Sequence, residues 1–265
     1  MAAEVMIGIF DSGDGGLPTL KAVRGVLPQY DYVYLGDHAR APYGPRSQEE
    51  IFEFTWQGVK FLFDQGCVLV VLACNTASAN ALRRIQQERL PETFPDRRVL
   101  GILVPTVEQI ASTEGSSTVL VLGTSATINS QAYVIEVEKR DPKRRVIQQA
   151  CPELVPLIEM GASQDRLKEV VARYLEPYRT VLSAGDAVVL GCTHYELIQD
   201  LIAEHLPDGV KLFGQSAILA QSLKNYLERH PELESRITRE ASVRYLTTGD
   251  PAKLSRAAFV HADIS

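Results

Sequence analysis

The chain has 265 residues, of which 45% are hydrophobic and 23% charged, and its formal net charge is −6 at pH 7. This length predicts one large or two modest domains, and the negative charge argues against a broad nucleic-acid-binding surface. No apolar run approaches the roughly 20 residues that cross a membrane. No positive charge precedes the first apolar stretch, so we expect neither a membrane span nor a secretory signal.

The cysteines are too few and too scattered for a disulfide framework in a chain of this size; they are Cys67, Cys74, Cys151 and Cys192. No CxxC or HxxxH pair offers metal-ligand spacing, so we expect no metal. Free thiols are typical of a reducing compartment, and the sequence therefore predicts a cytoplasmic protein.

Apolar, strand-like runs alternate with amphipathic, helix-like runs along the chain. The expected strands are residues 5–10, 32–35, 68–73, 99–103, 118–122, 146–150, 187–190, 210–213 and 243–246. The expected helices are residues 16–27, 48–65, 77–90, 106–113, 130–139, 167–175, 195–206 and 217–229, with a short one after the last strand. Ser47 and Glu50 have the spacing of a capping box at the start of the second helix. The alternation predicts an α/β fold of parallel sheets flanked by helices.

Cys74 and Cys192 each follow an apolar run and precede small or hydroxylated residues and then a helical stretch. This order is typical of a buried parallel strand whose carboxyl end reaches a ligand-binding cleft. A cysteine taken singly is more often a buried structural residue, but the matched positions favour a reactive pair. A helix N-terminus lowers the pKa of a thiol, so we expect thiolate character at both sites. We interpret Cys67 and Cys151 as packing residues.

The first expected strand ends in a glycine-rich turn, Asp11-Ser12-Gly13-Asp14-Gly15-Gly16. Such a turn offers free backbone N–H groups to an anion, although it is also compatible with a simple helix cap. The lysine and hydroxyl of a nucleotide phosphate loop are missing, and the spacing is not GxGxxG. The carboxylate at the strand end suits a base or a hydrogen-bond partner better than a phosphate site.

Five motifs, in this order, resemble those of the glutamate racemase family: DSGxGG at residues 11–16, GDxARxPYG at 36–44, ACNTA at 73–77, CPxxVPLIE at 151–159 and GCTHY at 191–195. The resemblance spans residues 7 to about 220. It implies cofactor-independent interconversion of L- and D-glutamate, which supplies D-glutamate for peptidoglycan synthesis. It also implies that the protein is a homodimer. Its binding partner would be a small-molecule substrate, glutamate, and neither nucleic acid nor a membrane.

The resemblance further implies two pseudo-symmetric α/β lobes with the active site between them. The first lobe would comprise residues 1–99 and 212–265 and carry Cys74, and the second would comprise residues 100–211 and carry Cys192. Removing a weakly acidic α-proton and returning one to the opposite face needs two opposed acid–base groups. By resemblance, these two thiols are that pair.

The other expected site residues also follow from the matching motifs. Asp11 and His194 would assist one thiol each, and Asp37 and Glu159 would be supporting carboxylates. The residues expected to bind the substrate are Asp11, Ser12, Tyr43, Gly44, Asn75, Thr76, Thr193 and His194.

The chain departs from the family pattern at Asp14, where an apolar residue is usual, and at residues 212–216, which replace an acidic-serine turn. A carboxylate at Asp14 would repel an anionic substrate, so its replacement by valine is expected to lower KM and leave kcat unchanged. Alternative functions are a racemase of aspartate or another small amino acid, a cysteine-nucleophile hydrolase, and a non-catalytic binder of small acids. Aspartate-specific relatives tend to carry glutamate where His194 stands here.

Overall fold

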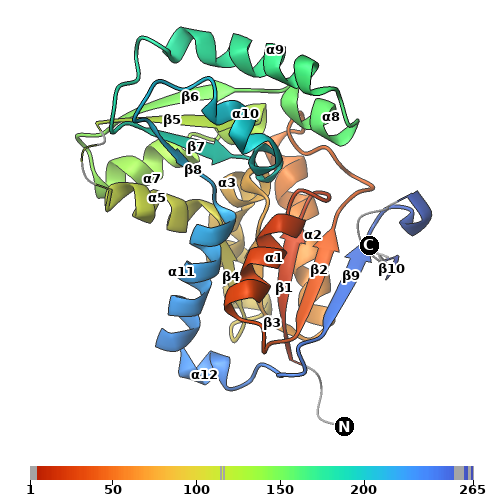
Figure 1. Cartoon of the computed structure of the whole chain (residues 1–265). Helices are drawn as coiled ribbons and strands as arrows, with labels where there is room; N and C mark the ends of the chain where they lie inside the picture. Colours follow the sequence, from red (N-terminus) through yellow and green to blue (C-terminus); the bar gives the residue numbers. More distant parts are fainter. Residues whose placement is uncertain (1–4, 114, 116, 254–259, 262–263, 265) are drawn as a thin grey trace.

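The computed structural model describes residues 5–113, 115, 117–253, 260–261 and 264. Every strand pairing in this part of the chain is parallel, as the βα alternation predicts. The strands form two separate sheets, a larger one in the lower lobe and a smaller one in the upper lobe of Figure 1.

The sheet of the first lobe has six strands in the order β10-β9-β2-β1-β3-β4. They are β1 Met6–Asp11, β2 Tyr32–Gly36, β3 Cys67–Leu72, β4 Arg98–Gly101, β9 Val243–Thr247 and β10 Val260–His261. The sheet of the second lobe has four strands in the order β6-β5-β7-β8. They are β5 Thr118–Gly123, β6 Arg145–Ala150, β7 Ala187–Gly191 and β8 Lys211–Phe213.

The second sheet repeats the order of four consecutive strands of the first, because β6-β5-β7-β8 corresponds to β2-β1-β3-β4. In this correspondence β3 is equivalent to β7, and these are the strands that precede Cys74 and Cys192. Each thiol therefore follows the same strand of its own sheet, next to the point where the strand order reverses. Ligands bind outside the carboxyl ends of the strands at such points.

Helices cover both faces of each sheet. The helices are α1 Leu17–Val26, α2 Gln48–Asp64, α3 Asn75–Arg84, α4 Leu90–Thr93, α5 Leu103–Ala111, α6 Ser125–Asn129, α7 Ala132–Arg140, α8 Leu154–Glu159, α9 Gln164–Leu175, α10 Gln199–Ala203, α11 Ser216–Arg229 and α12 Pro231–Glu234. A π-helical segment, η1 Ile85–Arg89, and 3₁₀ segments, η2 Glu176–Tyr178, η3 Thr193–Ile198 and η4 Pro251–Lys253, complete the described elements.

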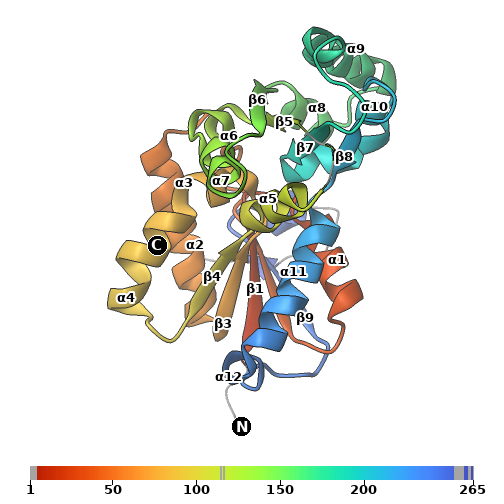
Figure 2. The same ribbon diagram turned by 90° about the vertical axis from the view of Figure 1, so that its left-hand side faces the viewer.

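Four apolar clusters make up the core, one on each face of each sheet. In the first lobe α2 and α3 pack on one face, and α1 and α11 on the other. In the second lobe α8, α9 and α10 pack on one face, and α5 and α7 on the other. Figure 2 shows α5 lying at the junction, above the first sheet and beside α11.

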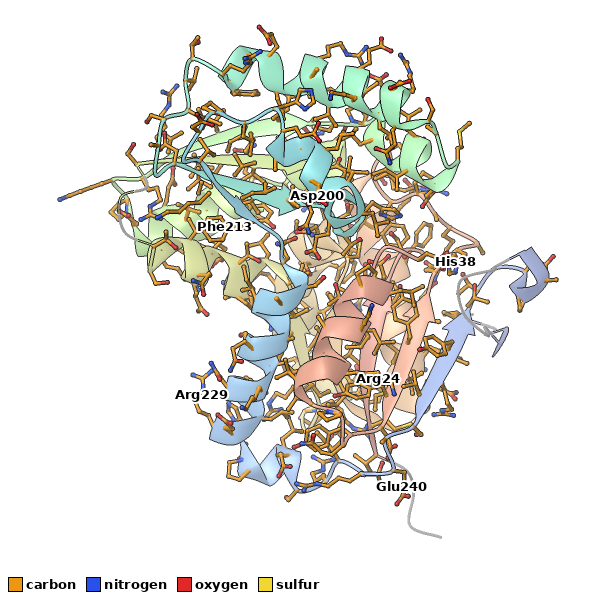
Figure 3. The ribbon with its side chains drawn as sticks, viewed as in Figure 1. Arg24, His38, Asp200, Phe213, Arg229 and Glu240 are labelled. Carbon is orange, nitrogen blue, oxygen red and sulfur yellow. The ribbon has the colours of Figure 1, made fainter. Side chains whose placement is uncertain are left out.

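The chain passes from the first sheet to the second and back again. β4 ends the first pass through the first lobe at Gly101, and α5 begins at Leu103 under the second sheet. The chain leaves the second sheet after Phe213, and α11 then runs down to Arg229 in the first lobe, as Figure 3 shows.

Of the local predictions, some are confirmed and others are wrong. The capping box at Ser47 is confirmed, with both reciprocal hydrogen bonds to Glu50 present. The single helix expected over residues 195–206 is wrong, because Cys192 is followed by the tight 3₁₀ turn η3 and only then by α10. α6, α8 and β10 were not expected. The short helix expected after residue 246 corresponds to η4, and residues 254–259 lie outside the described part.

Among the described residues no helix is long and apolar enough to cross a membrane.

Candidate active site

A buried pocket at the junction of the lobes is lined by the carboxyl ends of strands from both sheets. Of the expected site residues, only Asp11 and Asp37 lie outside its lining. The expected residues that do line it are Ser12, Tyr43, Gly44, Cys74, Asn75, Thr76, Glu159, Cys192, Thr193 and His194. Both thiols thus face one pocket although they lie 118 positions apart in the chain (192 minus 74).

Cys74 lies at the N-terminus of α3, in the N-cap position. Its thiol donates to the Ser12 hydroxyl at 3.6 Å, and its sulfur accepts the Ala77 backbone N–H at 3.5 Å. Burial, with a smaller contribution from the charge of Asp11, nevertheless raises the thiol pKa to about 12. The expectation of thiolate character from the helix N-terminus is therefore wrong for Cys74, because desolvation outweighs the two hydrogen bonds.

Cys192 is paired with a histidine. The His194 Nδ1 atom lies 3.9 Å from the Cys192 sulfur, and the Nε2 atom lies 3.1 Å from a Glu159 carboxylate oxygen. The second contact is an ion pair rather than a hydrogen bond, since Nε2 has no partner of suitable geometry. Burial lowers the pKa of His194, but Cys192, Glu159 and the charge of Asp11 together raise it to about 10. These contacts therefore favour the imidazolium form of His194.

Asp11 lies at the end of β1, fully buried behind the pocket wall rather than in it. Its carboxylate accepts the Gly13 backbone N–H at 2.9 Å and the Thr193 hydroxyl at 3.4 Å. Burial raises its pKa to about 6, against the opposing influence of His194 and these hydrogen bonds. The geometry supports an electrostatic role beside Cys74 and His194 and does not support direct contact with a substrate.

The glycine-rich turn packs directly against the segment that follows Cys192. A Cβ atom added at Gly15 would lie 2.4 Å from the Thr193 hydroxyl oxygen and 2.6 Å from the His194 ring. No side chain fits at such distances, so glycine is what allows the turn of the first lobe to reach His194 in the second.

Asp37 is also fully buried and lies outside the pocket lining. It accepts hydrogen bonds from Arg40 Nε at 2.7 Å, from the Tyr43 hydroxyl, and from the Thr248 hydroxyl at 2.6 Å. The Tyr43 hydroxyl is thus turned to Asp37, which holds the loop of residues 38–46 over the pocket. Asp37 thus holds the side chain of Tyr43, a residue of the pocket lining, from outside the pocket.

Thr76 joins the lobes at the pocket through a triangle of hydroxyl groups. Its oxygen lies 2.8 Å from that of Thr124 and 3.2 Å from that of Thr127, which are themselves 3.0 Å apart. Thr124 follows β5 at the position that corresponds to the end of β1 in the first lobe. Hydroxyl groups line this wall of the pocket, and they can donate hydrogen bonds to a carboxylate.

Asp14, which departs from the family pattern, is not among the residues that line the pocket. Its carboxylate lies 2.9 Å from His38 Nε2, and His38 Nδ1 lies 2.8 Å from the Thr247 hydroxyl at the end of β9. Burial lowers the pKa of His38, but the pairing with Asp14 raises it overall. Figure 3 shows His38 at the upper edge of the first lobe, where the two lobes meet.

Sequence reasoning missed part of the pocket wall; the missed residues are Ala41, Pro42, Pro45, Thr124, Ser125, Cys151, Pro152, Val155 and Pro156. The interpretation of Cys151 as a packing residue is incomplete, because this buried thiol also lines the pocket, and burial raises its pKa to about 12. Thr124 and Ser125 could have been found, because they follow a strand of the second sheet as Ser12 follows one of the first.

The pocket lining is nearly free of charge. Glu159 and His194 are its ionisable members apart from the thiols and Tyr43, and none of the described lining residues is lysine or arginine. No group of three His, Cys, Asp or Glu side chains suited to a metal ion is found among the described residues. Hydroxyl, amide and backbone groups are therefore the means by which this pocket can hold polar parts of a ligand.

Comparison with known proteins decides the family. The family model of Asp/Glu/hydantoin racemases matches residues 19–223, which is more than half of the chain. The chain belongs to this racemase family. Within the family, it is 44% identical to the glutamate racemase of Phenylobacterium zucineum over 263 residues, which cover 92% of each chain.

Solved structures of family members have the same fold. The glutamate racemase of Francisella tularensis, in complex with D-glutamate, is 31% identical with a TM-score of 0.85 and covers 99% of this chain and 98% of its own. The glutamate racemase of Thermus thermophilus, in complex with β-chloro-D-alanine, is 32% identical with a TM-score of 0.82 and covers 100% and 99%. The racemase family membership confirms the resemblance read from the five motifs, and the α/β fold of two parallel sheets is confirmed with it.

Proposed function

We propose that this chain, an amino-acid racemase by family, interconverts L- and D-glutamate with two cysteines and without a cofactor. The observation that carries the proposal is that Cys74 and Cys192 follow equivalent strands of two similar sheets and line one pocket. The glutamate racemases with which the chain shares its length and fold support glutamate as the substrate.

The reaction needs a thiolate on one side of the substrate Cα and a thiol on the other. The thiolate removes the α-proton, the thiol donates a proton to the opposite face, and the two sulfurs exchange protonation states. The high pKa of Cys74 favours its thiol form in the resting enzyme. When Cys192 carries the negative charge, the His194 imidazolium 3.9 Å away balances it.

The α-proton is removed more easily when the negative charge that develops on the substrate is stabilised in a site that excludes water. The hydroxyls of Thr76 and Thr124 line the pocket, and the one that accepts in their mutual hydrogen bond can donate to a substrate carboxylate. Their contact with each other already holds these groups in place, so little reorganisation is needed when the charge develops.

Incubation with L-glutamate in deuterated water tests the proposal. Optical rotation should fall to zero while the Cα proton is replaced by deuterium, with no added pyridoxal phosphate, metal or nucleotide. Binding of glutamate without exchange would instead identify a non-catalytic binder, and hydrolysis of an amide or ester would identify the hydrolase. Aspartate is expected to be a poor substrate, because one missing methylene leaves polar groups of the pocket unpaired. Equal kcat/KM for aspartate would reassign the substrate.

Replacing either thiol separates the two-base reaction from a single-nucleophile reaction. Cys74→Ser and Cys192→Ser should each abolish racemisation, since each thiol serves one face of the substrate. A hydrolase that uses Cys192 alone would survive the change at Cys74. Near-normal racemisation by either variant would refute the two-base assignment.

The proposal includes a cytoplasmic homodimer that supplies D-glutamate for peptidoglycan, as the family resemblance implies. Sedimentation of the purified protein tests the dimer. Depletion of the protein from the cells that make it tests the cellular role, because growth should then depend on added D-glutamate.

A further inference from the structure

A closed ring of three hydrogen bonds lies at the junction of the lobes, among side chains that are almost completely buried. Asn75 Nδ2 donates to Gln215 Oε1 at 2.6 Å, Gln215 Nε2 donates to the Tyr133 hydroxyl oxygen at 2.7 Å, and the Tyr133 hydroxyl donates to Asn75 Oδ1 at 2.7 Å. The second proton of Gln215 Nε2 goes to the Thr106 hydroxyl at 2.8 Å.

Every donor of this ring faces an acceptor, and the Gln215 and Asn75 amides could be reversed only together, at the cost of the bond that Gln215 donates to Thr106. Reversing the Gln215 amide alone would set its NH₂ group against that of Asn75 and leave Tyr133 without a donor. All three side chains are at most 2% exposed, so a broken bond would leave a buried polar atom unpaired. Because each bond fixes the direction of the next, the ring behaves as one rigid unit.

The ring members come from both lobes, and two of them lie beside the backbone that leads to or follows the two cysteines. Asn75 directly follows Cys74 and begins α3. Tyr133 belongs to α7 of the second lobe, and its ring carbon would lie 3.5 Å from a Cβ added at Gly191, the residue before Cys192. Gln215 lies between β8 and α11, where the chain passes from one lobe to the other, and Glu196 accepts its backbone N–H.

We propose that this ring sets the separation and orientation of the two thiols, and that Gln215 and Tyr133 are positioning residues for the two-base reaction. The inference rests on the proposed function, because only a reaction that uses both thiols depends on their spacing. The ring uses one N–H of Asn75 Nδ2, so the second can still reach a ligand in the pocket that Asn75 lines.

The spacing of two bases can be tested by comparing a two-thiol reaction with a one-thiol reaction. From 3-chloroglutamate a single thiolate removes the α-proton, the electron pair forms the Cα–Cβ double bond, and chloride leaves. The proton on the thiol then returns to solvent. Loss of folded protein lowers both reactions together, whereas a change in spacing lowers racemisation selectively.

Tyr133→Phe is expected to reduce racemisation of glutamate about 100-fold, because misplacing a reacting group by about 1 Å lowers the rate by about that factor. Elimination, which uses one thiolate, should fall by less than about threefold. The matched control is Tyr32→Phe, which loses a buried hydrogen bond of 2.7 Å to the Leu27 carbonyl, away from the pocket. The control should leave the ratio of the two rates unchanged. Gln215→Met, which keeps the volume and removes the amide, should reproduce the effect of Tyr133→Phe if that variant folds poorly.

A parallel loss of both reactions in Tyr133→Phe and Gln215→Met would overturn the inference. The ring itself is tested without activity, by exchange of the Gln215 side-chain amide protons with deuterated solvent. Exchange should be slow in Tyr32→Phe and much faster in Tyr133→Phe. If the unaltered protein does not racemise glutamate, the proposed function fails on its own, and the exchange measurement still reports whether the ring exists.

Discussion

Replacing Asp11 with asparagine should make the fold more stable while reducing racemisation. Asp11 is fully buried, and burial raises its pKa from 3.8 to about 6. Asparagine has almost the same shape, can accept the Gly13 N–H with its oxygen, and can direct its NH₂ group at the Thr193 hydroxyl. The substitution therefore removes a costly buried charge and keeps the hydrogen bonds.

The expected gain follows from the pKa shift. Because the pKa of Asp11 is higher in the folded chain than in the unfolded chain, protonation of Asp11 favours the folded state. This stabilisation is complete below pH 3.8 and is lost as the pH rises through about 6. With about 1.4 kcal/mol per pKa unit, the charged carboxylate costs about 3 kcal/mol above pH 6. The gain from asparagine should therefore grow from about 1.5 kcal/mol at pH 5 to about 3 kcal/mol at pH 8.

Urea unfolding of the two proteins at several pH values between 5 and 8 measures this gain. Asp31→Asn is the control of opposite sign. Burial raises the pKa of Asp31, but hydrogen bonds from hydroxyl and backbone N–H groups lower it below its ordinary value. Its stabilisation is present above pH 3.8 and lost as the pH falls, so asparagine there should destabilise across the whole range. A gain for Asp11→Asn that is absent or independent of pH would refute the reasoning.

Two further substitutions test the turn at residues 11–16. Gly15→Ala should reduce racemisation about 100-fold, because the added methyl would displace His194. The control is Gly25→Ala in α1, where the added methyl meets nothing within 4 Å and should leave activity unchanged. Equal activity of the two variants would contradict the packing described. Asp14→Val should lower the pKa of His38, which NMR titration measures, because the ion pair is lost. A raised histidine pKa stabilises the folded protein below pH 6.5, and this stabilisation is lost as the pH rises through the raised value. Relative to the parent protein, the variant should therefore lose most stability at pH 6 and little at pH 9.

The sequence was sufficient to locate the two thiols because the geometry of parallel sheets leaves little freedom. A buried strand that leads directly to Cys74 or Cys192 must place that residue at the carboxyl edge of its sheet. The expected neighbours within a few residues of these cysteines therefore fell in the pocket as well.

Features that depend on distant side chains could not be predicted. The protonation of Cys74 depends on a balance between burial and hydrogen bonding that a helix N-terminus alone does not determine. The position of Asp11 behind the pocket depends on how the turn packs against Thr193. The hydrogen-bonded ring joins residues 58, 82 and 140 positions apart, and no local pattern marks Tyr133 or Gln215 as partners.

The repeated strand order has a consequence for the kinetics of the proposed reaction. In the proposed reaction each thiol acts on one face of the substrate, and the equivalent strands that carry the thiols have different neighbours, with His194 beside Cys192 and Ser12 beside Cys74. Enantiomers have equal free energies in water, so kcat/KM must be the same in both directions. Any kinetic difference that the two lobes produce must therefore appear as paired changes in kcat and KM, with the enantiomer of lower KM turned over more slowly.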